Sequence, residues 1–115
     1  MSRNNASLLD IYEAGQQILS YAQGLNRSEL QGDKMRVSAI LYQVLIMGEA
    51  TKRLSPEFRS QHPQIPWSNI AGMRDTVAHE YDRIEFGILW AVIQNSIPEL
   101  LEMITPLLPK ESDPG

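Results

Sequence analysis

Residues 33–55, DKMRVSAILYQVLIMGEATKRLS, form the stretch that decides the fold. Asp33 is a residue type that caps helix N-termini, and Ser55-Pro56 ends the segment because proline cannot continue a helix. Between them apolar residues recur at helical steps over a wide face: Met35, Ala39, Ile40, Val44, Leu45, Met47 and Gly48. A wide apolar face is typical of a helix with neighbours on more than one side. We therefore predict a long central helix here.

The segments around this helix show the same periodicity. It predicts three more main helices, at about 5–23, 67–81 and 83–107. Residues 56–61 fit a short helical turn, and the prolines at 63 and 66 predict an irregular connection before Trp67. In the last helix we expect the buried face to include Ile88 and Ile93, and we expect Pro98 to kink or break the helix.

No stretch of the chain alternates apolar and polar residues in the manner of a strand. The predicted fold class is therefore all-α, an up-and-down bundle of four main helices with short helical turns. The 115 residues, 43% of them hydrophobic, suffice for one core. We predict a single domain over 1–115, in which 108–115 form a flexible tail.

Composition narrows the possible chemistry. The absence of cysteine excludes a disulfide scaffold, a thiolate nucleophile and a zinc site built on sulfur. Only His62 and His79 supply imidazole, so no metal site and no cofactor are predicted. The net charge of −4 disfavours nucleic-acid binding by bulk electrostatics, so such a role requires a local site.

Neither a secretory signal nor a membrane span is predicted. Residues 1–5 lead straight into an amphipathic segment, and polar residues interrupt the longest apolar-rich stretch, 86–108. The expectation is a cytoplasmic protein without membrane contact.

The residues with the most chemical potential lie in 74–81, RDTVAHEY. Arg74 offers a permanent forked cation suited to a phosphodiester, and His79 can exchange a proton near neutral pH. Asp75, four residues before His79, is expected to reach its ring and set its basicity. On spacing alone, an Arg, an Asp and a His on one helix most often form an ordinary solvated face with one such pair.

A cation and an imidazole beside a phosphate are the minimum for RNA cleavage without a metal, because the 2′-hydroxyl of RNA is itself the nucleophile. The protein then has to move protons and neutralise the charge that develops on the phosphate oxygens. One histidine is few for both acid and base. Two copies of this face across a two-fold axis would supply two arginines and two histidines.

Arg74, His79 and Tyr81 follow the pattern R-x4-H-x-Y, which resembles the signature of HEPN-domain toxins of the HepT type. Residues 47–50, Met-Gly-Glu-Ala, resemble the apolar-Gly-Glu-Ala element of that family's second helix. Residues 63–67, Pro-Gln-Ile-Pro-Trp, followed by Gly-Met-Arg at 72–74, resemble the start of its catalytic helix. The resemblance extends over about 8–107, nearly the whole chain.

The resemblance implies a HEPN-like fold and a metal-independent endoribonuclease that cleaves tRNA or mRNA in a composite site at a homodimer interface. It also implies the toxin of a type VII-like toxin–antitoxin system, with an MntA-like minimal nucleotidyltransferase as antitoxin. By position, Arg74 would hold the phosphate, His79 would be the acid–base residue, and Tyr81 would accept AMP from the antitoxin. Asp75 and Glu49 would support the site, although these families often carry Asn or another polar residue at the position of Asp75.

Two alternatives remain open. Glu49 is either a cleft-facing carboxylate near the catalytic helix or a helix residue paired with Lys52 or Arg53. The chain as a whole is either the ribonuclease or a non-enzymatic helical module that binds a nucleotide or a nucleotidyltransferase through the same face. Outside the site, Asp33 is expected to be a helix cap and Trp67 a core anchor.

Overall fold

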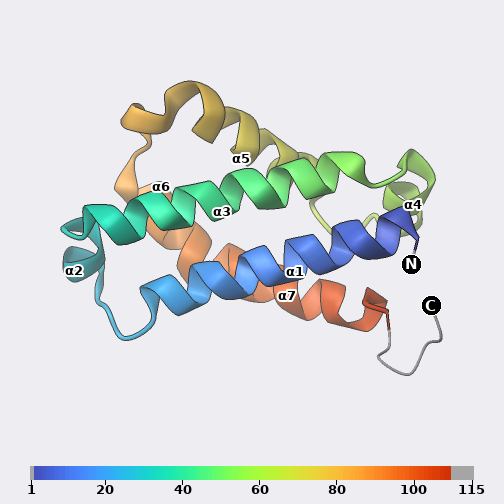
Figure 1. Cartoon of the computed structure of the whole chain (residues 1–115), viewed down its shortest axis with the longest axis horizontal. Coiled ribbons are helices and arrows are strands. Elements are labelled where there is room, and N and C mark those ends of the chain that lie inside the picture. The colour runs from blue at the N-terminus through green and yellow to red at the C-terminus, as the bar shows by residue number, and fades with distance from the viewer. Residues whose placement is uncertain (1, 110–115) are drawn as a thin grey trace.

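The computed structural model describes residues 2–109, and within them every regular element is helical. Long helical segments run up and down in chain order (Figure 1): α1 (Arg3–Ala22), α3 (Lys34–Arg53), α5 (Trp67–Glu80), and α6 (Phe86–Ala91) followed by α7 (Ile97–Ile104). Short helices join them, α2 (Arg27–Gln31) and α4 (Pro56–Gln61), with 3₁₀ turns at Tyr81–Arg83 and Thr105–Leu107. The predicted all-α bundle is confirmed.

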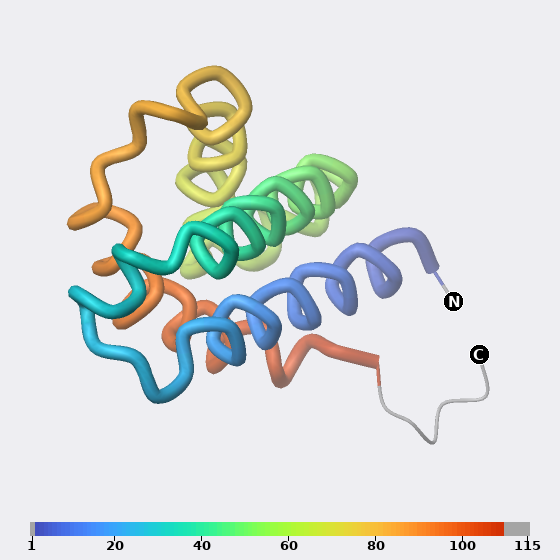
Figure 2. The backbone as a smooth tube through the Cα atoms, turned by 60° about the vertical axis from the view of Figure 1, so that its left-hand side comes forward, coloured from blue at the N-terminus to red at the C-terminus, as the bar shows by residue number. Residues whose placement is uncertain are grey.

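Helix α3 occupies the centre, as its wide apolar face predicts. It packs against α1 on one side and α5 on the other, while α7 covers α1 (Figures 1 and 2). The completely buried side chains include residues from each of these layers except α5: Leu8, Ile11, Ile18, Ile40, Ala50 and Ile104. Among residues 2–109, no helix is both long and apolar enough to cross a membrane.

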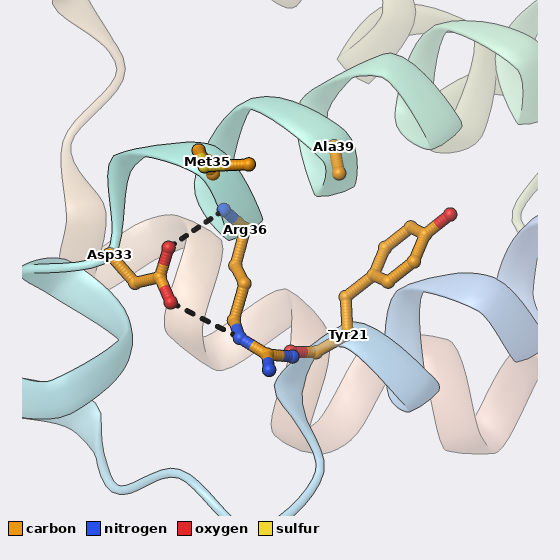
Figure 3. A pocket seen from close by; sticks show the side chains of 5 residues that line it. All are labelled: Tyr21, Asp33, Met35, Arg36 and Ala39. Atoms are coloured by element: carbon orange, nitrogen blue, oxygen red, sulfur yellow. Dashed lines mark hydrogen bonds and ion pairs between the residues drawn. The ribbon is translucent and has the colours of Figure 1, made fainter.

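The start of α3 is fixed by Asp33, as predicted (Figure 3). The Oδ1 atom of Asp33 accepts a hydrogen bond from the backbone N–H of Arg36 at 3.0 Å, and its Oδ2 pairs with Arg36 Nε at 3.1 Å. The same guanidinium donates through NH1 to the carbonyl of Tyr21 at 2.9 Å, which ties the end of α1 to the start of α3. An open hollow lies beside these contacts, and its lining residues are Tyr21, Asp33, Met35, Arg36 and Ala39.

Trp67 anchors the start of α5 in the core, which confirms its predicted role. Its indole is buried and its Nε1 donates to the carbonyl of His62 at 3.0 Å. The ring of His62 packs on Phe58 of α4 with 4.6 Å between ring centroids. The connection with two prolines is therefore held by aromatic packing and one indole hydrogen bond.

The last helix contains an interruption before Pro98. Residues Val92–Ser96 form a π-helical segment between α6 and α7, and the N–H of Ile97 donates to the carbonyl of Val92. Proline lacks an N–H and its ring collides with the carbonyl four residues earlier, so a wider turn accommodates it. The predicted disturbance at Pro98 takes this form.

This end of the chain differs from expectation at Ile88 and includes part of the predicted tail. Ile88 was expected to be buried, and that expectation is wrong because its side chain is 61% exposed. Ile88 lies at the edge of the apolar face of the last helix, and the buried residues of that face include Leu89 and Ile93. Within the expected tail, Leu108 is partly buried against the core, and residues 110–115 lie outside the described part of the chain.

Candidate active site

The two helices that carry the candidate residues approach closely at Gly48. A Cβ atom built on Gly48 would lie 2.1 Å from Arg74 Cβ and 3.3 Å from Arg74 Cα. A distance of 2.1 Å is far too short for two carbon atoms that are not bonded, so no larger residue fits at position 48 without a shift of α5. Glycine at this position therefore places the base of the Arg74 side chain directly on α3.

Arg74 is held at the junction of the two helices. Its Nε forms an ion pair with Glu49 Oε1 of α3, although the contact lacks hydrogen-bond geometry, and its NH1 donates to Asp75 Oδ1 at 3.2 Å. The side chain of Arg74 is 29% exposed, so part of the guanidinium still faces solvent. Glu49 thus lies beside α5, the helix that carries Arg74 and His79, which agrees with the alternative that placed this carboxylate near the catalytic helix.

The expected partners of two charged residues differ in the structure. Asp75 was expected to reach His79, but its Oδ1 accepts from Lys52 Nζ at 2.6 Å and from Arg74. Lys52 therefore does not pair with Glu49, and Arg53 pairs with Asp10 of α1 at 3.2 Å. A partner on α3, 23 positions earlier in the sequence, could not be read from helical spacing within α5.

These contacts link Glu49, Arg74, Asp75 and Lys52 into one continuous series, here named the ion-pair chain. The hydrogen bond from Lys52 and the adjacent guanidinium lower the pKa of Asp75 below its ordinary value of 3.8, because both favour the charged carboxylate. Asp75 is therefore an anion throughout the neutral range. The ion-pair chain alternates negative and positive groups across the α3–α5 junction.

His79 and Tyr81 lie beyond the ion-pair chain, at the free end of α5. His79 is exposed, and among residues 2–109 no hydrogen bond or ion pair engages its ring. The α-helical backbone ends at Glu80 (φ −130°, ψ 35°), and Tyr81 begins the 3₁₀ turn with 47% of its side chain exposed. The predicted end of the helix is thus correct within one residue.

An apolar cavity of about 250 Å³ lies on the inner side of α5. Its lining comes from α3, α5 and the start of the last helix: Leu41, Val44, Met73, Thr76, Val77, Ile84, Ile88, Leu89 and Val92. The cavity borders α5 at Met73, Thr76 and Val77, so the stretch of α5 between Arg74 and His79 is backed by a hollow, whereas Arg74 itself packs on Gly48 of α3.

Lys52 was not connected with the candidate site on the sequence alone. The available signal was that Lys52 follows Gly48 by four residues and therefore lies on the same face of the helix. Within residues 2–109, no group of three or more His, Asp or Glu side chains is arranged to hold a metal ion.

Comparison with known proteins supplies the family. Residues 11–107 match the family described as Ribonuclease HepT-like. "Putative RNase TTE0752" of Caldanaerobacter subterraneus subsp. tengcongensis is 36% identical over 94 residues, which cover 82% of this chain and 84% of the relative. "Probable ribonuclease HepT" of Thermococcus cleftensis is 33% identical over 101 residues, which cover 87% and 92%. No solved structure is significantly similar.

The family match extends over most of the helices, from within α1 to the 3₁₀ turn after α7, and includes the whole ion-pair chain together with His79 and Tyr81. The chain belongs to the HepT-like ribonuclease family.

Proposed function

We propose that this protein is a metal-independent endoribonuclease, with a composite site formed by Arg74 and His79 of two copies of the chain. The observation that carries the proposal is that one helix bears both a cation that is held in place and an imidazole that has no partner among residues 2–109. Glu49 and Gly48 hold Arg74 at the helix junction, while His79 lies exposed further along α5. The chain belongs to a family of ribonucleases, and in such an enzyme a cation and an imidazole on one helix can serve to cleave RNA.

The proposed reaction is an internal transesterification of RNA. The 2′-oxygen forms a bond to the adjacent phosphorus and the bond from phosphorus to the 5′-oxygen breaks, so the products are a 2′,3′-cyclic phosphate and a 5′-hydroxyl. A base takes the proton of the 2′-hydroxyl, and an acid gives a proton to the leaving 5′-oxygen. Arg74 neutralises the charge that develops on the non-bridging oxygens.

The need for two proton transfers supports a dimer. Each chain has one histidine in the motif. The other histidine, His62, packs on Phe58 near the start of α5, at the opposite end of that helix from His79. Exposed apolar side chains near the motif, Tyr81 and Ile88, supply surface that association could cover. In a two-fold dimer one His79 acts as base and the other as acid.

The activity is tested with a fluorescent RNA in buffer that contains a metal chelator. The wild type should leave cyclic-phosphate 3′ ends, and both Arg74→Ala and His79→Ala should lower the rate by at least about 100-fold. His62→Ala is the matched control and should keep wild-type activity once its fold is confirmed by circular dichroism. Equal activity in all of these variants would refute the assignment.

The composite site is tested with mixed dimers. A wild-type chain and a His79→Ala chain with different tags are co-expressed and the mixed species is purified. A shared site predicts activity far below half of the wild-type value, because each site then lacks one of its two histidines. Half activity would mean that each chain works alone, and a monomer in light scattering would exclude the arrangement.

We further propose that the protein is the toxin of a toxin–antitoxin pair and that a minimal nucleotidyltransferase neutralises it by AMP transfer to Tyr81. The exposure of Tyr81 next to the motif helix supports this role. A bulky anionic group there would compete with RNA for the site. Incubation with ATP and the transferase should add mass in multiples of AMP.

Tyr42 provides the control for that experiment because its side chain is also exposed, at 58%. Tyr81→Phe should abolish the mass increase, and Tyr42→Phe should leave it unchanged. Modification that persists in Tyr81→Phe would contradict the proposed acceptor. Binding of nucleotide or transferase without any RNA cleavage would instead favour the non-enzymatic module.

A further inference from the structure

Two cations of the ion-pair chain converge on one oxygen atom. Lys52 Nζ lies 2.6 Å and Arg74 NH1 lies 3.2 Å from Asp75 Oδ1. A non-bridging phosphate oxygen accepts charge-assisted hydrogen bonds in the same manner as a carboxylate oxygen. The carboxylate of Asp75 therefore occupies a position that a phosphate oxygen could take.

The two cations reach that oxygen because α3 and α5 meet at this point. Lys52 comes from the last turn of α3 and Arg74 from the middle of α5, and they meet because Gly48 lets the helices touch. Glu49 binds Arg74 through Nε, on a different nitrogen from the one that contacts Asp75. Replacing Asp75 by phosphate would thus leave the guanidinium anchored.

We propose that Lys52 is a second phosphate-binding residue beside Arg74, and that Asp75 is an internal counter-ion which RNA phosphate displaces. This inference rests on the proposed ribonuclease function. Lys52 and Asp75 are both about half exposed, with side-chain exposures of 40% and 48%, so a phosphate can reach the pair and Asp75 can turn into solvent. Bound RNA then exchanges one anion for another at the same two cations.

The exchange has a consequence for affinity. RNA must compete with a carboxylate that is already in place, and the chain as a whole carries a net charge of −4. Binding should therefore be weak, and it should weaken further as the salt concentration rises. The lysine contributes one of the phosphate contacts that release counter-ions, about 0.7 of a unit in the logarithmic salt slope for single strands.

The test measures RNA binding in the His79→Ala background, where the RNA stays intact. Lys52→Ala should weaken binding by about 3- to 10-fold and reduce the salt slope, because a phosphate contact is lost. Lys52→Arg should restore binding. Arg53→Ala is the matched control, since Arg53 is the next residue, is 45% exposed and also pairs with an aspartate, Asp10.

Asp75→Asn tests the counter-ion and has an expected effect of opposite sign. Loss of the competing charge should tighten RNA binding several-fold, whereas a carboxylate that merely positions the cations would weaken binding when removed. Unchanged or weaker binding by Asp75→Asn overturns this part of the proposal. If Lys52→Ala fails to fold by circular dichroism, Lys52→Gln, which keeps most of the aliphatic stem, replaces it.

The outcomes separate this inference from the proposed function. If the wild type neither cleaves nor binds RNA, both fail. If the wild type cleaves RNA while Lys52→Ala and Arg53→Ala bind it equally, the role of Lys52 is refuted and the ribonuclease assignment stands.

Discussion

Two glycines on the α3–α5 pair have opposite environments, although both lie inside helices. A Cβ on Gly48 would collide with the Cβ and Cγ atoms of Arg74, whereas a Cβ on Gly72 would meet nothing within 4 Å. Gly48→Ala should therefore destabilise the protein by about 1–3 kcal/mol, because α5 must move away from α3. It should also displace Arg74 and reduce any RNA cleavage.

Gly72→Ala is the control for that prediction. Alanine at an open helical position restricts the unfolded chain and should stabilise the protein by about 0.4–1 kcal/mol. Both free energies of unfolding are measured by urea denaturation. Equal effects of the two substitutions would show that helix propensity, and not the close contact, decides the outcome at position 48.

The ion pairs of Asp75 predict a dependence of stability on pH. The pKa of Asp75 is lowered in the folded state by Lys52 and Arg74, so folding is favoured while the carboxylate is charged. That contribution is present above the ordinary pKa of 3.8 and disappears as the pH falls through the lower, folded value. Asp75→Asn should therefore be less stable than the wild type at pH 7, and the difference should shrink below about pH 4.

The measurement is urea denaturation of both proteins at several pH values between 3 and 7. A constant difference across this range would mean that the charge of Asp75 does not contribute. Lys52→Ala should reduce the same pH dependence, because it removes the largest cause of the lowered pKa.

At the scale of single elements, the start of α3 depends on Asp33 in two ways. Its carboxylate accepts the backbone N–H of Arg36 and also pairs with the Arg36 side chain. Asp33→Ala should cost about 0.5–2 kcal/mol because it removes the cap. Asp33→Asn keeps a good capping group, so it should lose only the weak surface ion pair, less than about 1 kcal/mol.

Thermal or urea unfolding of these two variants separates the cap from the charge. Losses of equal size would assign the effect to the ion pair with Arg36 instead of the backbone hydrogen bond.

The sequence predicted elements well where periodicity was long, and poorly where it was short. The central helix, its cap at Asp33 and its end before Pro56 were all correct. Helix α2 was not among the predicted helices, because five residues cannot show a helical period. Its capping box, Asn26 with Glu29, was the available local signal.

The sequence proposed residues for the candidate site but did not indicate their contacts. The resemblance of the R-x4-H-x-Y pattern singled out Arg74, His79 and Tyr81, and the structure places all of them on α5 or at its end. The partners of Asp75 and Glu49 come from another helix, so no spacing within one helix could indicate them. Packing of whole helices decides such pairs.

At the scale of the whole molecule, the layers differ in how firmly they are attached. Among the described residues, α3 is the one helix that α5 packs against extensively, while α1 is covered by both α3 and α7 (Figure 2). The cavity beside Met73, Thr76 and Val77 removes further contacts of α5. Helix α5 is thus an outer layer attached along one side.

That one-sided attachment implies two separate opening reactions in one small domain. Local opening requires less free energy where few buried apolar contacts must be broken, so the amides of α5 should exchange with deuterium by a sub-global route, whereas those of α1 and α3 should exchange only on global unfolding. Native-state exchange followed by mass spectrometry would resolve the two rates, and equal protection of all three helices would contradict them. On heating, the residues of the motif would then separate from one another while most of the bundle is still folded.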